Sequence, residues 1–107
     1  LAFGGYSTAY VAIAEEWNGS SWTEVGDMGT SRTTFGGAGT NTSALGFGGN
    51  ASGSATDITE SWNGTSWTET ADLNLARWEV YGTGASSTAA ICSGGQSPGG
   101  TYANNEI

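Results

Sequence analysis

The side chains that could do chemistry in this chain are few and unbalanced. Its 107 residues include ten acids, two arginines and one cysteine, with no histidine. Paired carboxylates can hydrolyse glycosidic bonds, but no pattern in the sequence brings two acids to one pocket. Cys92 has no histidine to activate it as a nucleophile. We therefore expect no catalytic residue.

Three glutamates occupy one position of a repeated pattern, namely Glu15, Glu60 and Glu106. They could act as ligands, or they could pair with Arg32 and Arg77. A repeated position usually serves the scaffold, so we expect the pairing. Asp27 and Asp72 fit turn or capping roles, because no loop has the dense oxygen ligands of a calcium site. We expect no metal and no cofactor.

The formal net charge of −8 limits the partners of the chain. Such a surface repels the phosphates of nucleic acids and anionic lipid headgroups. No apolar run approaches the roughly 18 residues of a membrane-spanning helix. We therefore expect no nucleic-acid partner and no membrane insertion. The acidity fits a secreted or particle-bound protein, so an extracellular or virion-associated location is favoured.

An internal repeat supplies the elements that must position these residues. The pattern Leu-x-Phe-Gly-Gly at 1–5 returns at 45–49 and, more weakly, at 91–95. The pattern Glu-x-Trp-Asn-Gly-x-Ser-Trp-Thr-Glu at 15–24 returns 45 residues later. The match covers nearly the whole chain, and a period of this length is typical of a repeat architecture.

Every segment of the repeat is short and β-like. Ala44–Phe47, Ile58–Trp62 and Ser66–Thr70 are strand-length runs bounded by turn residues. A fourth strand of small residues is expected over 37–44, with its counterpart over 82–90. The Asn-Gly steps predict tight hairpins of either two or four residues. In both cases the two tryptophans of a hairpin share one face of the sheet.

The repeat resembles kelch repeats. A kelch unit carries Gly-Gly after its second strand, an aromatic residue near the end of its third, Trp on its fourth, and often Arg before the next unit. The residues at these places are Gly4, Gly5, Trp17, Trp22, Arg32, Gly48, Gly49, Trp62, Trp67, Arg77, Gly94 and Gly95. The first aromatic residue is Trp here, where Tyr is more common.

The resemblance implies an all-β fold, a β-propeller of four-stranded kelch-like blades with about 2.5 blades in this chain. An incomplete blade would span 1–31, a complete repeat with its linker 32–76, and a second incomplete blade 77–107. The other blades of the ring would come from flanking sequence or from copies of the chain.

The loops after each Gly-Gly, at 6–11, 50–57 and 96–104, vary most among the repeats. Variable insertions in repeat folds map to one face, which is often the binding face. Tyr6, Tyr10 and Tyr102 are candidate ligand-binding residues there, since their rings suit stacking on a sugar. Simple loop packing is the alternative.

Our leading hypothesis is a non-enzymatic propeller module that binds a protein or a glycan. The repeats resemble those of virion and cell-surface proteins of aquatic microbes and their phages, which implies a role in attachment. One alternative is a purely structural or assembly component of a larger particle. Another is a fragment of a propeller enzyme whose active site lies elsewhere.

Overall fold

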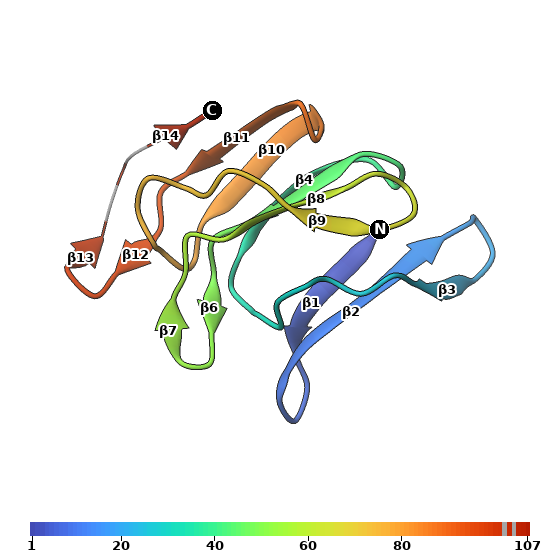
Figure 1. Cartoon of the computed structure of the whole chain (residues 1–107), viewed down its shortest axis with the longest axis horizontal. Coiled ribbons are helices and arrows are strands. Elements are labelled where there is room, and N and C mark those ends of the chain that lie inside the picture. The colour runs from blue at the N-terminus through green and yellow to red at the C-terminus, as the bar shows by residue number, and fades with distance from the viewer. Residues whose placement is uncertain (102, 104) are drawn as a thin grey trace.

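The structure is a computed structural model that describes residues 1–101, 103 and 105–107, and it confirms the expected all-β class (Figure 1). Sheet I contains β1 (Ala2–Tyr6), β2 (Tyr10–Trp17) and β3 (Trp22–Val25). Sheet II contains β4 (Gly36–Gly39), β5 (Ala44–Phe47), β8 (Thr59–Trp62) and β9 (Trp67–Glu69). Sheet III contains β10 (Tyr81–Ser86), β11 (Ala89–Ser93) and β14 (Asn105–Glu106).

Two short hairpins extend from these sheets. One pairs β6 (Asn50–Ala51) with β7 (Ser54–Ala55), and the other pairs β12 (Gln96–Ser97) with β13 (Gly100–Thr101). All strand pairs are antiparallel, and the three larger sheets do not close on one another. No helix that could span a membrane occurs among the described residues. Tyr102 and Asn104 lie outside the described part of the chain.

Sheet II follows one repeat of the sequence as a meander in the order β4-β5-β8-β9. Its first strand is shorter than expected, because β4 ends at Gly39 instead of continuing to Ala44. The hydroxyl of Thr40 accepts hydrogen bonds from the backbone N–H groups of Thr42 and Ser43 (3.4 and 3.2 Å). This side chain stabilises a turn between β4 and β5.

The Asn-Gly hairpins have four-residue loops. Trp62 lies directly opposite Trp67, and the side-chain oxygen of Asn63 accepts hydrogen bonds from the N–H groups of Thr65 and Ser66 (both 2.9 Å). The β2–β3 hairpin repeats this arrangement. Because asparagine satisfies two loop amides, it favours the longer of the two loops left open by the sequence.

The sheets pack by fitting an aromatic ring of one sheet over glycines of the next. Phe3 of β1 lies against Gly37 and Gly46 of sheet II, where an added Cβ would approach its ring to 3.0 Å. Phe47 covers Gly82 of sheet III in the same way, and an added Cβ there would come within 2.4 Å of the ring. The repeated glycines therefore allow two sheets to approach closely.

The core lies between sheets II and III, where Phe47, Val80 and Cys92 are buried together. The Trp face of sheet II is covered by sheet I, since the rings of Phe3 and Trp67 are 4.7 Å apart. Trp62 is consequently 1% exposed, whereas the equivalent Trp17 of sheet I is 45% exposed. The Trp residue of the hairpin is thus buried in sheet II, and its equivalent in sheet I is exposed.

Candidate functional site on the hairpin edge

The three Gly-Gly pairs occupy equivalent places of the repeat: Gly48-Gly49 and Gly94-Gly95 directly follow β5 and β11, whereas Gly4-Gly5 lies within β1 at an irregularity in its pairing with β2. Both glycines of each pair have positive φ, with values of 64° and 111°, 65° and 103°, and 68° and 97° along the chain. Only glycine adopts this backbone without strain. A Cβ on Gly49 would also lie 2.7 Å from the carbonyl oxygen of Thr33. The repeated motif is therefore a conformational requirement after β5 and β11 and at the irregularity in β1.

The segments that leave these glycines lie along one border of the molecule. They are the β1–β2 turn (7–9), the β6–β7 hairpin (50–55) and the β12–β13 hairpin (96–101), which we call the hairpin edge (Figure 1). The turns that contain the Asn-Gly steps lie at the opposite end of the sheets. The segments that vary most in sequence are thus gathered on one side.

Two of the three tyrosines predicted from the sequence form a pair on this edge. Tyr6 lies opposite Tyr10 at the end of the β1–β2 hairpin, with ring centroids 5.5 Å apart and ring planes at 80°. Tyr6 is 63% exposed and Tyr10 is partly buried. An edge-to-face pair holds an exposed ring in a defined orientation. Tyr102 lies outside the described residues, so its place in the site stays a prediction.

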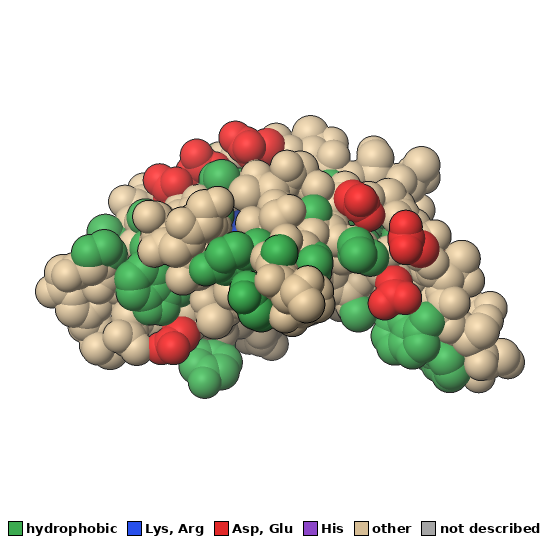
Figure 2. Space-filling view, turned by 90° about the horizontal axis from the view of Figure 1, so that it is seen from below, with side chains coloured by type: hydrophobic (Ala, Val, Ile, Leu, Met, Phe, Trp, Pro, Cys, Tyr) green, Lys and Arg blue, Asp and Glu red, His purple; other side chains and the backbone are tan. Residues whose placement is uncertain are grey.

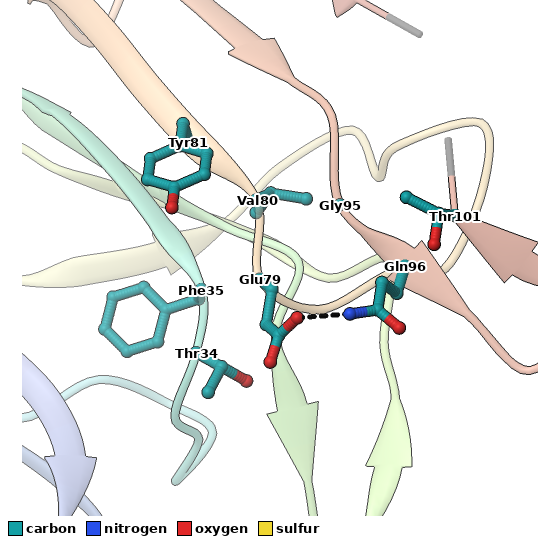
Figure 3. A pocket seen from close by; sticks show the side chains of 8 residues that line it. All are labelled: Thr34, Phe35, Glu79, Val80, Tyr81, Gly95, Gln96 and Thr101. Carbon is teal, nitrogen blue, oxygen red and sulfur yellow. Dashed lines mark hydrogen bonds between the residues drawn. The ribbon is translucent and has the colours of Figure 1, made fainter. Parts of the chain in front are cut away.

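A groove of about 480 Å³ lies beside the β12–β13 hairpin (Figure 3). Figure 3 shows the rings of Phe35 and Tyr81 on one side and the polar groups of Glu79, Gln96 and Thr101 on the other. The amide of Gln96 donates a hydrogen bond to a carboxylate oxygen of Glu79. Apolar surface beside a few fixed polar groups is typical of binding sites for small polar ligands.

Sequence reasoning missed this groove, because nothing in the sequence marks the two residues that join its sides. Thr34 and Glu79 occupy equivalent positions 45 residues apart, each two residues after an arginine. Both have left-handed backbone, with φ of 52° and 55°. The N–H of Glu79 donates to the carbonyl of Thr34 (2.7 Å), which joins the entries of sheets II and III. Non-glycine residues in this conformation often mark functional or tightly constrained sites.

The two arginines stabilise sheets II and III, from which two of the hairpins of this edge extend. Arg32 and Arg77 are fully buried, and they form ion pairs with Glu60 (3.0 Å) and Glu106 (2.9 Å) respectively. The predicted pairing is confirmed for these two glutamates. Burial lowers the pKa of Arg32, and the charge of Glu60 opposes that effect. Glu15 is exposed.

Figure 2 views the molecule from the side of the hairpin edge. Hydrophobic side chains appear in patches, and acidic side chains lie in separate groups, while almost no cationic side chain is visible. The buried arginines explain this, since the chain has no other cationic residue. The edge therefore suits neutral or cationic ligands better than anionic ones.

The described part of the chain has no cluster of three or more side chains that could bind a metal ion. Cys92 is buried in the core, and burial raises the pKa of its thiol. A side-chain nitrogen of Arg77 lies 3.5 Å from its sulfur. Its environment is that of a packing residue.

Comparison with protein-family models and with curated proteins finds no match to this chain.

Proposed function

We propose that the chain is part of a kelch-like β-propeller that binds a glycan or a protein through its hairpin edge and does no chemistry itself. The three sheets would be successive blades, one complete and two incomplete. Each would use its Gly-Gly pair to present a variable hairpin. Such a module would serve attachment at a virion or cell surface.

The equivalence of the three sheets supports the propeller arrangement. The three Gly-Gly pairs have similar positive φ values, and the rings of Phe3 and Phe47, which precede two of the pairs, pack over glycines of the next sheet. Radial repetition of four-stranded sheets is how propellers bury both faces of every blade. Sheet II has four strands in the order that such a blade requires.

One observation carries the binding role: the Tyr6–Tyr10 pair sits on an edge where all the variable hairpins gather. An exposed ring held by a second ring is a stable platform for the apolar face of a sugar. Elsewhere on the same edge, the groove beside the β12–β13 hairpin adds fixed hydrogen-bonding groups from Glu79 and Gln96. A neutral glycan fits this combination best, and a protein loop is the second candidate.

A purely structural role in a larger particle would bury the same edge against neighbouring subunits. A propeller enzyme would need catalytic groups from other parts of its ring. The Tyr6–Tyr10 pair supports recognition, because a ring held edge-to-face by a second ring is oriented for a ligand in the chain itself.

The test is binding of the purified chain to an array of neutral and acidic glycans, followed by affinity measurement for the strongest ligand. Tyr6→Ala should weaken binding by at least about fivefold, since truncating a contact aromatic costs more than about 1 kcal/mol. Trp22→Ala is the matched control, because this exposed ring lies opposite Trp17, at the far end of β2 from Tyr10. Equal loss in both variants, or no glycan bound, would contradict glycan recognition at this edge.

A further inference from the structure

Sheets II and III each hold a guanidinium group, and the two groups share a carbonyl and a carboxylate acceptor at equivalent positions. Arg32 donates to the carbonyl oxygens of Gly46 (3.0 Å), Gly48 (2.8 Å) and Ile58 (2.6 Å), and to the carboxylate of Glu60 (3.0 Å). In sheet III, Arg77 donates to the carbonyl of Gly94 and to the carboxylate of Glu106. Each arginine thus ties the entry of its sheet to the second and third strands.

Sheet I has the same acceptors at equivalent positions. By the spacing of the repeat, Gly46, Gly48, Ile58 and Glu60 correspond to Ala2, Gly4, Ile13 and Glu15. Both arginines of the chain are already bound by their own sheets. Accordingly Glu15 is exposed, whereas Glu60 is 2% exposed.

Sheet I also has a free edge where the other sheets have a strand. Its order is β1-β2-β3, so β1 is an edge strand, whereas the equivalent β5 and β11 pair with β4 and β10. The outer backbone groups of an edge strand are a template for another strand. In sheet II, β4 begins only four residues after Arg32. By analogy, one incoming segment could place its arginine at the acceptors of sheet I and its following strand along the open edge of β1.

The fit of side chains defines the strand that this edge would accept. In sheet II, Gly36 lies opposite Phe47, and a Cβ on it would come within 2.3 Å of the Phe47 ring. In sheet III the aromatic residue is on the first strand of the pair and the small residue on the second, since Tyr81 of β10 lies opposite Ser93 of β11. Because Phe3 takes the place of Phe47 in sheet I, the residue opposite it has to be glycine.

We propose that sheet I binds a glycine-rich β-strand led by an arginine, with glycine four residues after the arginine. The strand would pair with β1, and its guanidinium group would bind Glu15 and the carbonyls of Ala2, Gly4 and Ile13. Its source is a further repeat unit of the same kind, since both arginines present are bound by their own sheets. This inference rests on the proposed equivalence of the three sheets, and it names the partner of sheet I.

The test adds the strand to the intact chain. A copy of residues 32–44 is fused directly before Leu1, so that the copied alanine precedes Leu1 as Ala44 precedes Leu45. Amide hydrogen exchange and the thermal midpoint are measured for the original and extended chains. The outward amides of β1 should exchange at least about tenfold more slowly in the extended chain, and its midpoint should rise.

Three variants of the extended chain separate specific pairing from general stabilisation. Glu15→Gln, replacement of the copied arginine by Gln, and replacement of the copied glycine opposite Phe3 by Val should each remove most of the gain. In the original chain, Glu15→Gln should leave exchange of β1 unchanged. An equal gain with all three variants would overturn the proposal.

Two other outcomes would also overturn it. An extended chain that folds but shows no protection of β1 would mean that the edge does not accept this strand. Dimers of the original chain that dissociate on Glu15→Gln would assign the site to a second copy instead. Glycan binding through Tyr6 can be measured in the same samples, so a failure of the strand proposal is distinguishable from a failure of the proposed function.

Discussion

Replacing Glu60 by glutamine tests the buried ion pair that holds sheet II together. The substitution keeps the size of the side chain and removes its charge, which leaves the buried guanidinium of Arg32 without a counter-ion. Removing one partner of a buried pair costs about 3–5 kcal/mol. Arg32 keeps three carbonyl acceptors, so we expect a loss at the lower end, about 3 kcal/mol. For a domain of this size the thermal midpoint would fall by roughly 12–24 °C.

The assay is urea unfolding followed by tryptophan fluorescence, with the free energy of unfolding taken from the midpoint and slope. Glu15→Gln is the matched control, because Glu15 occupies the same repeat position but is exposed. Its effect should stay within about 0.5 kcal/mol, as for most surface substitutions. If the two variants lost the same free energy, the buried pair would have no special role and the reasoning would be refuted.

Three further changes probe the packing between sheets II and III. Phe47→Ala should cost about 3–5 kcal/mol in urea unfolding, because it empties the core between the sheets; a loss as small as that of the exposed Tyr81→Ala would contradict this. Gly82→Val should cost at least about 1–3 kcal/mol, since its Cβ would meet Phe47 and a backbone oxygen, and Thr83→Val is its neighbouring control. Burial raises the pKa of Cys92, so less thiolate exists at a given pH; alkylation by iodoacetamide should be slow in the folded chain at pH 8 and should speed up on unfolding, whereas equal rates would show an accessible thiol.

The repeat in the sequence predicted the all-β class and the approximate positions of the strands in sheet II. The strand Ala44–Phe47 has the predicted bounds, and the strands that contain Trp62 and Trp67 are shorter than predicted by one or two residues at their ends. The pairing of Arg32 with Glu60 followed from their recurrence, because a repeated charged position usually has a repeated partner. These features depend on residues within one repeat.

Two kinds of feature were not predictable: the choice between local turn geometries, and the contacts between repeats. The length of the Asn-Gly loops depends on which amides Asn63 binds, and the sequence allowed either choice. The groove forms from Phe35 of one sheet entry and Glu79 of the next, together with Gln96. No local pattern reports that these segments meet. The left-handed backbone of Thr34 and Glu79 was equally hidden, since neither residue type requires it.

The exposed Trp17 and Trp22 illustrate the same limit. Their sequence is almost that of the Trp62–Trp67 hairpin, yet burial differs because a neighbouring sheet covers only one of the two hairpins. Burial in a repeat protein is a property of neighbours as much as of the residue. The pattern of tryptophans therefore predicts which face is apolar and leaves open what covers it.

The most direct test of the central claim is the structure of the assembled protein by electron cryomicroscopy. Our account predicts a closed ring in which sheets I to III are neighbouring blades and the β6–β7 and β12–β13 hairpins lie on an open edge beside Tyr6. Sheets that do not form a ring, or a hairpin edge buried against other subunits, would contradict a recognition module built on a propeller.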